Sequence, residues 1–243
     1  RLVAPLIGGI SVSFAMERAV SRQSMQEFGI SSEEIKGLEQ ACRHTQNCEQ
    51  REFDQRLAQY FREHKLRLRT VPGERSRLFV DIPAVVRNSR ADVQPVAEAL
   101  RQLAAEQGQD ADWIFDSAVA MVQSGLEYRK PQALESGRQT LGFYTPSRAL
   151  EKGYGDCDTK SALLASILQN LGGSRLVGVR LPGHYLLGVA RKPNPGQAFV
   201  RYKGETFVLL EAAGPAQRPI GDIAAKTRLA LERGEEIRFD PMF

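Results

Sequence analysis

The chain has 243 residues, enough for one large domain or two small ones, and its 42% hydrophobic and 26% charged residues are typical of a globular protein. The 33 basic and 29 acidic residues give a net charge of +4, which is spread along the chain. We find no RNA-recognition signature, zinc-finger spacing or long basic run, so nucleic-acid binding is not expected. No stretch reaches the roughly 18 apolar residues of a membrane-spanning helix. Membrane proximity through a signal or anchor preceding Arg1 stays open.

The first third of the chain predicts a small α/β region. Residues 5–14 have the apolar alternation of a strand. Ser31 followed by Glu34 is a capping-box sequence ahead of a helix, and Asn47 followed by Gln50 is a similar start for a second helix. We therefore expect a helix hairpin in this region.

The three cysteines divide into a close pair and a single residue. Cys42 and Cys48 would point in different directions on one continuous helix, but a break at 44–47 between two helices can bring them together. A Cys42–Cys48 disulfide with Cys157 as a free thiol is typical of an exported protein. Three reduced thiols in a cytosolic protein fit the cysteine count equally well.

Strands are expected next at 65–71 and 76–86, around a Pro-Gly turn. The polar segment 88–95 ends in proline and is the best boundary between two regions. It divides the chain into an N-terminal α/β region with a helix hairpin (1–94) and a second domain (95–243).

The second region predicts an α+β domain. Helical patterns cover 96–108 and 111–128, and a third helix is expected from about 158 to 171, ended by Gly172 and Gly173. An antiparallel meander with one more helix should follow. Its strands are expected at 174–181, 184–192, 197–203, 205–212 and 235–240, and its helix at 221–234.

Cys157 lies in the stretch GYGDCDTKSALL, at the start of the third helix. Backbone N–H groups and the helix dipole favour an anion there, so thiols at such positions ionise readily. Asp156 and Asp158 oppose this effect, and either can cap the helix. From its position alone, Cys157 is a nucleophile or a packed structural thiol.

A cysteine nucleophile needs a base, and the base needs an orienting acceptor. His184 opens a predicted strand 27 residues after Cys157, and Glu211 ends another strand 27 residues later. If these strands are antiparallel neighbours, the three side chains converge on one cleft. Taken singly, His184 also fits a polar turn residue, and Glu211 fits the solvated end of a strand.

The block GYGDCDTKSALLASILQNLG, followed by the His184 strand GHYLL and then FVLLE, resembles the transglutaminase-like superfamily. It is most similar to the bacterial transglutaminase-like cysteine peptidases. The resemblance covers about 95–225 and implies a papain-like core, in which a helix-borne cysteine packs on an antiparallel sheet. The N-terminal α/β region is then an extension of this core.

The resemblance implies a Cys157, His184 and Glu211 triad that cleaves or transfers amide bonds of a peptide or protein substrate through a thioester. The third residue of this family is usually aspartate, so Glu211 departs from the pattern. The backbone N–H of Cys157 would stabilise the oxyanion. Gln139 and Tyr144 are the two side-chain candidates for a second donor.

The sequence therefore predicts a cysteine peptidase, amidase or acyltransferase, periplasmic or otherwise exported, with hydrolysis favoured over transfer. The alternative is a non-catalytic transglutaminase-like module that binds a partner or scaffolds an envelope protein. No cofactor is expected. Some bacterial relatives bind calcium through acidic residues that Asp156 and Asp158 match, but two carboxylates also fit a helix cap and a solvated charge.

Overall fold

The computed structural model describes residues 2–5, 11–44, 48–69, 76–172, 174–214, 216–234 and 236–243. Its helices are α1 (Arg18–Gln26), α2 (Ser32–Arg43), α3 (Gln50–Glu63), α4 (Ile82–Asn88), α5 (Arg90–Gln107), α6 (Ala111–Gly125), α7 (Pro146–Lys152), α8 (Cys157–Leu171) and α9 (Ala225–Glu232). Its strands are β1 (Leu2–Pro5), β2 (Ser11–Phe14), β3 (Ile30–Ser31), β4 (Leu66–Arg69), β5 (Arg77–Val80), β6 (Glu127–Tyr128), β7 (Leu134–Glu135), β8 (Arg138–Gln139), β9 (Tyr154–Gly155), β10 (Leu176–Leu181), β11 (His184–Ala190), β12 (Phe199–Tyr202), β13 (Glu205–Leu210) and β14 (Arg238–Pro241). Within these described ranges, no helix is long and apolar enough to cross a bilayer.

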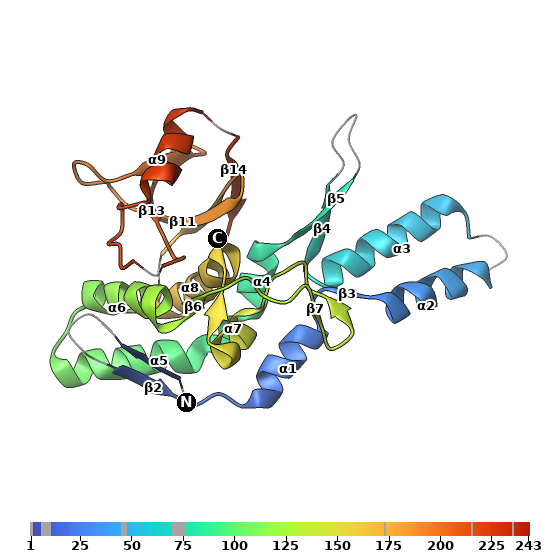
Figure 1. Ribbon diagram of the computed structural model, residues 1–243, viewed down its shortest axis with the longest axis horizontal. Helices are drawn as coiled ribbons and strands as arrows, with labels where there is room; N and C mark the ends of the chain where they lie inside the picture. The colour runs from blue at the N-terminus through green and yellow to red at the C-terminus, as the bar shows by residue number, and fades with distance from the viewer. Residues whose placement is uncertain are drawn as a thin grey trace.

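Helix α8 is the centre of an α+β fold (Figure 1). Its residues from Thr159 to Leu168 are all buried, because helices α4, α5, α6 and α7 pack against it and strand β11 crosses it. A helix buried all round carries apolar residues on every side rather than one stripe. The expected stripe, including Leu163 and Ile167, is therefore only part of its buried surface.

The five-stranded sheet is antiparallel, with strand order β12-β13-β11-β10-β14. The five strands expected from the sequence are all present, but β13 rather than β12 lies beside β11, so the chain does not form a simple meander. Tyr185, Leu187 and Val189 alternate along β11 and join the core that surrounds α8. Leu186 faces the opposite side, where Ile223 near α9 helps to cover a smaller second core. The sheet is thus buried on both faces.

The N-terminal region differs from its expected form in one strand. Residues 11–14 form β2 as predicted, whereas 6–10 lie outside the described residues. The strand expected at 76–86 is wrong beyond Val80, because α4 begins at Ile82. The Asp81 carboxylate accepts a hydrogen bond from the Ala84 N–H, which caps α4, and proline occupies its first turn.

The segment expected to separate two regions is helical. Residues 88–95 close α4 and open α5, and the boundary between 94 and 95 falls inside α5 together with Pro95. Phe28 and Leu66 from before this boundary share one core with Leu163 of α8. Apolar packing therefore continues across the position where the sequence predicted a linker.

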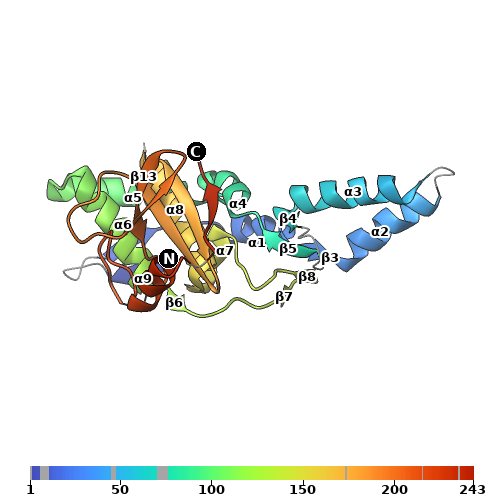
Figure 2. The ribbon, with the colours of Figure 1, turned by 90° about the horizontal axis from the view of Figure 1, so that it is seen from above.

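Helices α2 and α3 lie side by side as an arm that extends away from α8 (Figures 1 and 2). A disulfide joins Cys42 to Cys48, with Cα atoms 5.3 Å apart, so the predicted pairing is confirmed. The Ser31 hydroxyl accepts a hydrogen bond from the Glu34 N–H and caps α2 as expected. Helix α3 instead has Glu49 as its N-cap residue, and Asn47 lies outside the described residues.

Candidate active site

The approach to Cys157 is fixed by a short parallel pair of strands. Tyr128 of β6, just after α6, pairs with Gly155 of β9, which precedes α8. A Cβ atom on Gly155 would lie 2.5 Å from the Thr159 Cγ2 atom, so only glycine fits this close approach. The chain therefore turns directly into α8, and Cys157 is its first residue. The first N–H groups of a helix have no partner within it, and Cys157 lies at that end of α8.

His184 and Glu211 come together across two strands. β11 and β13 are antiparallel with Leu187 opposite Leu210, a register that makes His184 a diagonal neighbour of Glu211 on one face. The His184 Nε2 atom lies 3.0 Å from the Glu211 Oε2 atom. The predicted contact between the histidine strand and the glutamate strand is thus present.

The charges around His184 favour its protonated form. Burial alone would lower the pKa of the imidazole, but hydrogen bonds with Cys157 and Glu211 and the negative charge of Glu211 outweigh it and raise the pKa to about 10. Because Nε2 bonds to Glu211, Nδ1 is the nitrogen left for the thiol. His184 therefore pairs with the glutamate and lies within electrostatic range of the cysteine.

Cys157 and His184 line the same pocket, of about 510 Å³, which we call the thiol pocket. Cys157 is half-buried and is the free thiol among the three cysteines. Its Sγ atom lies 4.0 Å from the Asp158 Oδ1 atom. A partly exposed thiol beside a histidine in a pocket can reach a substrate, which a thiol packed in the core cannot.

Asp156 occupies the N-cap position of α8, yet its side chain makes no capping hydrogen bond, so the predicted cap is wrong in this respect. Its Oδ1 atom is buried without a hydrogen-bond partner. Burial and the nearby charge of Asp158 raise the pKa of Asp156 to about 7. Among the described residues, no cluster of three or more His, Cys, Asp or Glu side chains is arranged to hold a metal ion.

Two buried polar residues that the sequence analysis missed, Lys160 and Gln123, lie next to Glu211. Lys160 is 0% exposed, and its ammonium donates hydrogen bonds to the Gln123 and Leu126 carbonyls at the end of α6, 3.1 and 3.0 Å away. The Gln123 amide donates to the Glu211 carbonyl at 2.6 Å. Glu211 in turn is 5% exposed, and its Oε1 atom has no hydrogen-bond partner. The glutamate is therefore held through its backbone, next to a buried cation.

Lys160 also has a perturbed pKa. Burial lowers the pKa of its ammonium to about 8, against the opposing charge of Glu211. A lysine inside the apolar run 159–168 was a signal available in the sequence, because charged residues are seldom buried without a partner. Its partner on another element could not be read from the chain.

The two side-chain candidates for the oxyanion donor lie elsewhere. The Tyr144 hydroxyl is buried and lies 2.9 Å from the Tyr154 hydroxyl. Gln139 of β8 pairs with Ile30 of β3. Neither lines the thiol pocket. Tyr128 lines the neighbouring pocket together with His184 and Glu211. Burial and the negative charge of Cys157 both raise the pKa of its hydroxyl.

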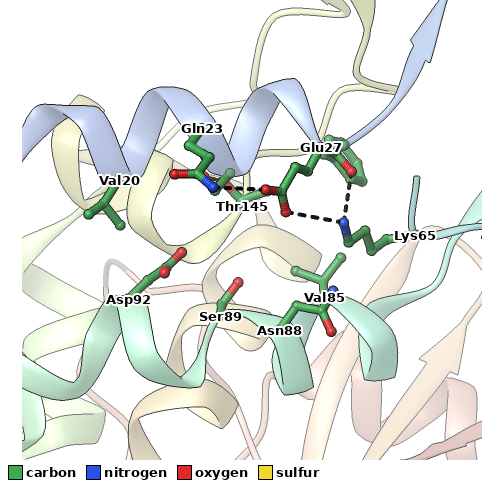
Figure 3. Close-up of a pocket in the computed structure, with 11 residues that line it drawn as sticks. Val20, Gln23, Glu27, Lys65, Val85, Asn88, Ser89, Asp92 and Thr145 are labelled. Atoms are coloured by element: carbon green, nitrogen blue, oxygen red, sulfur yellow. Dashed lines mark hydrogen bonds and ion pairs between the residues drawn. The ribbon is translucent and has the colours of Figure 1, made fainter. Parts of the chain in front are cut away.

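Two other pockets in the described part of the chain lack a cysteine. One of about 480 Å³ lies on the other side of His184 and is bordered by Tyr128, Leu181 and α9. A smaller one, of about 140 Å³, lies between α1 and the α4–α5 segment (Figure 3). Its polar side chains include Asp92 and the Glu27–Lys65 pair, and it has no cysteine or histidine. The Cys157–His184 arrangement is thus specific to the thiol pocket.

Comparisons with known proteins identify no relative: a scan of family models finds no match, and searches of curated proteins and of solved structures find none either.

Proposed function

We propose that this protein is a thiol enzyme with a transglutaminase-like, papain-like core, which cleaves or transfers amide bonds of a peptide or protein through a thioester. The observation that carries the proposal is His184, whose Nε2 atom lies 3.0 Å from the buried Glu211 carboxylate and which lines one solvent-open pocket together with Cys157. A base held between a nucleophile and an orienting carboxylate is the arrangement of cysteine hydrolases.

In the first half-reaction, the Cys157 sulfur attacks the carbonyl carbon of the substrate amide. An imidazolium beside a sulfur stabilises its thiolate, and His184 is protonated at neutral pH. As the C–S bond forms and the C–N bond breaks, the Nδ1 proton moves to the departing amine. The first backbone N–H groups of α8 would stabilise the oxyanion.

In the second half-reaction, neutral His184 takes a proton from water, which attacks the thioester carbon. A C–O bond forms, the C–S bond breaks, and Cys157 returns to its starting state with a carboxylic acid as product. An amine in place of water would give transfer. Glu211 keeps the imidazole oriented in both steps, since it accepts a hydrogen bond from the Nε2–H group. We rank hydrolysis first, because it requires no second substrate site.

We place this activity outside the cytoplasm, in the cell envelope or periplasm. The Cys42–Cys48 disulfide supports this location, because disulfides persist in oxidising compartments.

The proposal is tested by alkylation of Cys157, followed by mass spectrometry. At pH 6.5 an ordinary thiol is only about 1% ionised. Cys157 should therefore react with iodoacetamide at least about tenfold faster than glutathione. The disulfide protects Cys42 and Cys48, so the modification reports on one residue.

Two matched histidine variants sharpen this test. His184→Gln should slow alkylation at least about tenfold, because the imidazolium is lost. His64→Gln is the control, since His64 also lies beside a carboxylate, with Nε2 3.3 Å from the Glu34 Oε2 atom, but far from any free thiol. An unreactive Cys157, or equal rates in both variants, would leave a non-catalytic binding module as the better description.

A further inference from the structure

The thiol pocket continues into a second hollow that is rich in arginine. This hollow, of about 480 Å³, shares Phe79, Arg180 and Arg238 with the thiol pocket. It is bounded by β4 and β5 on one side and by β14 on the other. We call it the arginine groove, and it extends from the thiol pocket between the β4–β5 hairpin and strand β14.

Cations outnumber carboxylates along this combined surface. Asp156, Asp158, Glu236 and Asp240 are its acidic members. Of these, Asp240 is 5% exposed and lies beneath the groove, where Arg67 and Arg180 pair with it. The six basic members are Arg67, Arg69, Arg77, Lys130, Arg180 and Arg238.

Ion pairs neutralise part of the positive charge at this surface. Asp240 contacts Arg67 and Arg180, Arg67 also contacts the Asp81 carboxylate at 3.5 Å, and Arg238 pairs with Glu236 at 2.6 Å. Arg69 and Lys130 are exposed at opposite ends of the surface. Carboxylates of a ligand are therefore favoured here, since arginine binds them in a fixed, two-pronged geometry.

The strands beside the groove favour an extended chain. β14 is the edge strand of the five-stranded sheet, and its residues Arg238 and Phe239 line the groove. Edge strands present unpaired N–H and C=O groups that can bond to an added strand. Leu68, 51% exposed, and Phe79 add apolar surface between the charges. A polypeptide fits this combination better than a nucleic acid, because it has the alternating N–H and C=O groups with which an edge strand pairs.

We propose that the arginine groove binds an acidic, extended segment of the peptide whose amide is presented to Cys157. This inference rests on the proposed function and names the substrate class of the same site. The acidic residues would lie on one side of the reacting amide, toward β4 and β5, and the thiol pocket would receive the amide itself.

Binding is measured by fluorescence anisotropy on the full chain carrying Cys157→Ala, with labelled peptides of alternating glycine and glutamate, glutamine or lysine. The glutamate peptide should bind at least about tenfold more tightly than the glutamine peptide in 50 mM NaCl. This advantage should shrink in 500 mM NaCl because salt screens surface charges. Equal binding of the glutamate and glutamine peptides overturns the inference.

Three charge reversals locate the binding. Arg69→Glu and Lys130→Glu should each weaken glutamate-peptide binding at least about fivefold. Arg201→Glu is the matched control, since it is an exposed arginine on β12, at the opposite edge of the same sheet, and should change binding less than twofold. An equal loss in all three variants overturns the inference, as does tighter binding of a thymidine 15-mer than of the glutamate peptide.

The link to Cys157 has its own measurement. In the wild-type chain, a saturating glutamate peptide should slow iodoacetamide alkylation at least about threefold, whereas the lysine peptide should not. Absence of protection overturns the inference, because the bound segment would then not reach the thiol pocket. Failure of the proposed function is separate, since it is read from the alkylation rate without peptide and from His184→Gln.

Discussion

Two buried basic side chains, Arg138 and Lys160, stabilise two different regions of this molecule, and the carboxylates near them are bonded differently. Arg138 of β8, 7% exposed, fastens the α2–α3 arm through bonds to the Phe28 carbonyl and the Glu34 carboxylate, both at 2.7 Å. Lys160 of α8 lies under the candidate active site, next to Glu211. The Glu34 carboxylate has both oxygens bonded, the second by the Tyr60 hydroxyl at 2.8 Å, whereas one Glu211 oxygen has no hydrogen-bond partner.

This difference distinguishes a carboxylate that stabilises the packing of two elements from one that lies in a candidate active site. Buried polar atoms are nearly always bonded in folded proteins, so each exception needs a reason. At the arm, a fully bonded carboxylate fixes two elements against each other. At Glu211, a carboxylate with spare bonding capacity faces a histidine that must gain and lose a proton. Three variants test whether this contrast holds.

Lys160→Met is expected to have the largest effect. It leaves two buried carbonyls without their donor and Glu211 without its nearby cation, so the free energy of unfolding should fall by about 3 kcal/mol. Urea unfolding at pH 7 measures the loss. Cys157 alkylation should slow in the same variant, because Glu211 then holds His184 less firmly. A change below about 1 kcal/mol would show that the cation is not needed there.

Arg138→Met should cost less, about 2 kcal/mol in urea unfolding, because the Glu34 side chain is 44% exposed and water can replace its lost partner. The alkylation rate of Cys157 should stay as in the wild type, since Arg138 bonds to Phe28 and Glu34, neither of which lines the thiol pocket. If alkylation slows as much as in Lys160→Met, the two networks are one unit and the contrast is wrong.

Asp156→Asn should have the smallest effect and the opposite sign. The folded chain holds the pKa of Asp156 at about 7, above that of an unfolded aspartate near 4, so ionisation destabilises the folded state as pH rises from about 4 to 7. The substitution removes this penalty. A pKa difference of this size corresponds to about 3 kcal/mol between pH 4.5 and pH 8. Asp156 is partly exposed and water screens its charge, so we expect the stabilisation to be about 1 kcal/mol larger at pH 8 than at pH 4.5 in urea unfolding.

The control for this prediction is Asp110→Asn. The Asp110 carboxylate does cap its helix, accepting a bond from the Trp113 N–H at 2.9 Å, and asparagine can keep that bond. Its effect on the free energy of unfolding should be small, because asparagine keeps the capping bond. A pH-independent gain in Asp156→Asn would mean that the orphaned oxygen, rather than the charge, is the source of the penalty.

Much of the fold was predictable because it is encoded locally. Apolar periodicity located α6, α8 and the strands around His184 and Glu211, and the capping sequence at Ser31 located the start of α2. Residue type and position at element ends also singled out Cys157, His184 and Glu211 as a group to examine. These signals extend over a few residues, so they can be recognised without knowledge of the rest of the chain.

Tertiary structure decided what those elements touch. Only the order of the sheet places β13 beside β11 and brings Glu211 to His184. Packing of α8 on all sides buries Lys160, and a shared core joins residues on both sides of the boundary expected at 94. The physical reason is that burial and strand pairing depend on contacts between distant segments. Helices, their caps and the apolar alternation of strands are instead determined by residues close together in the sequence.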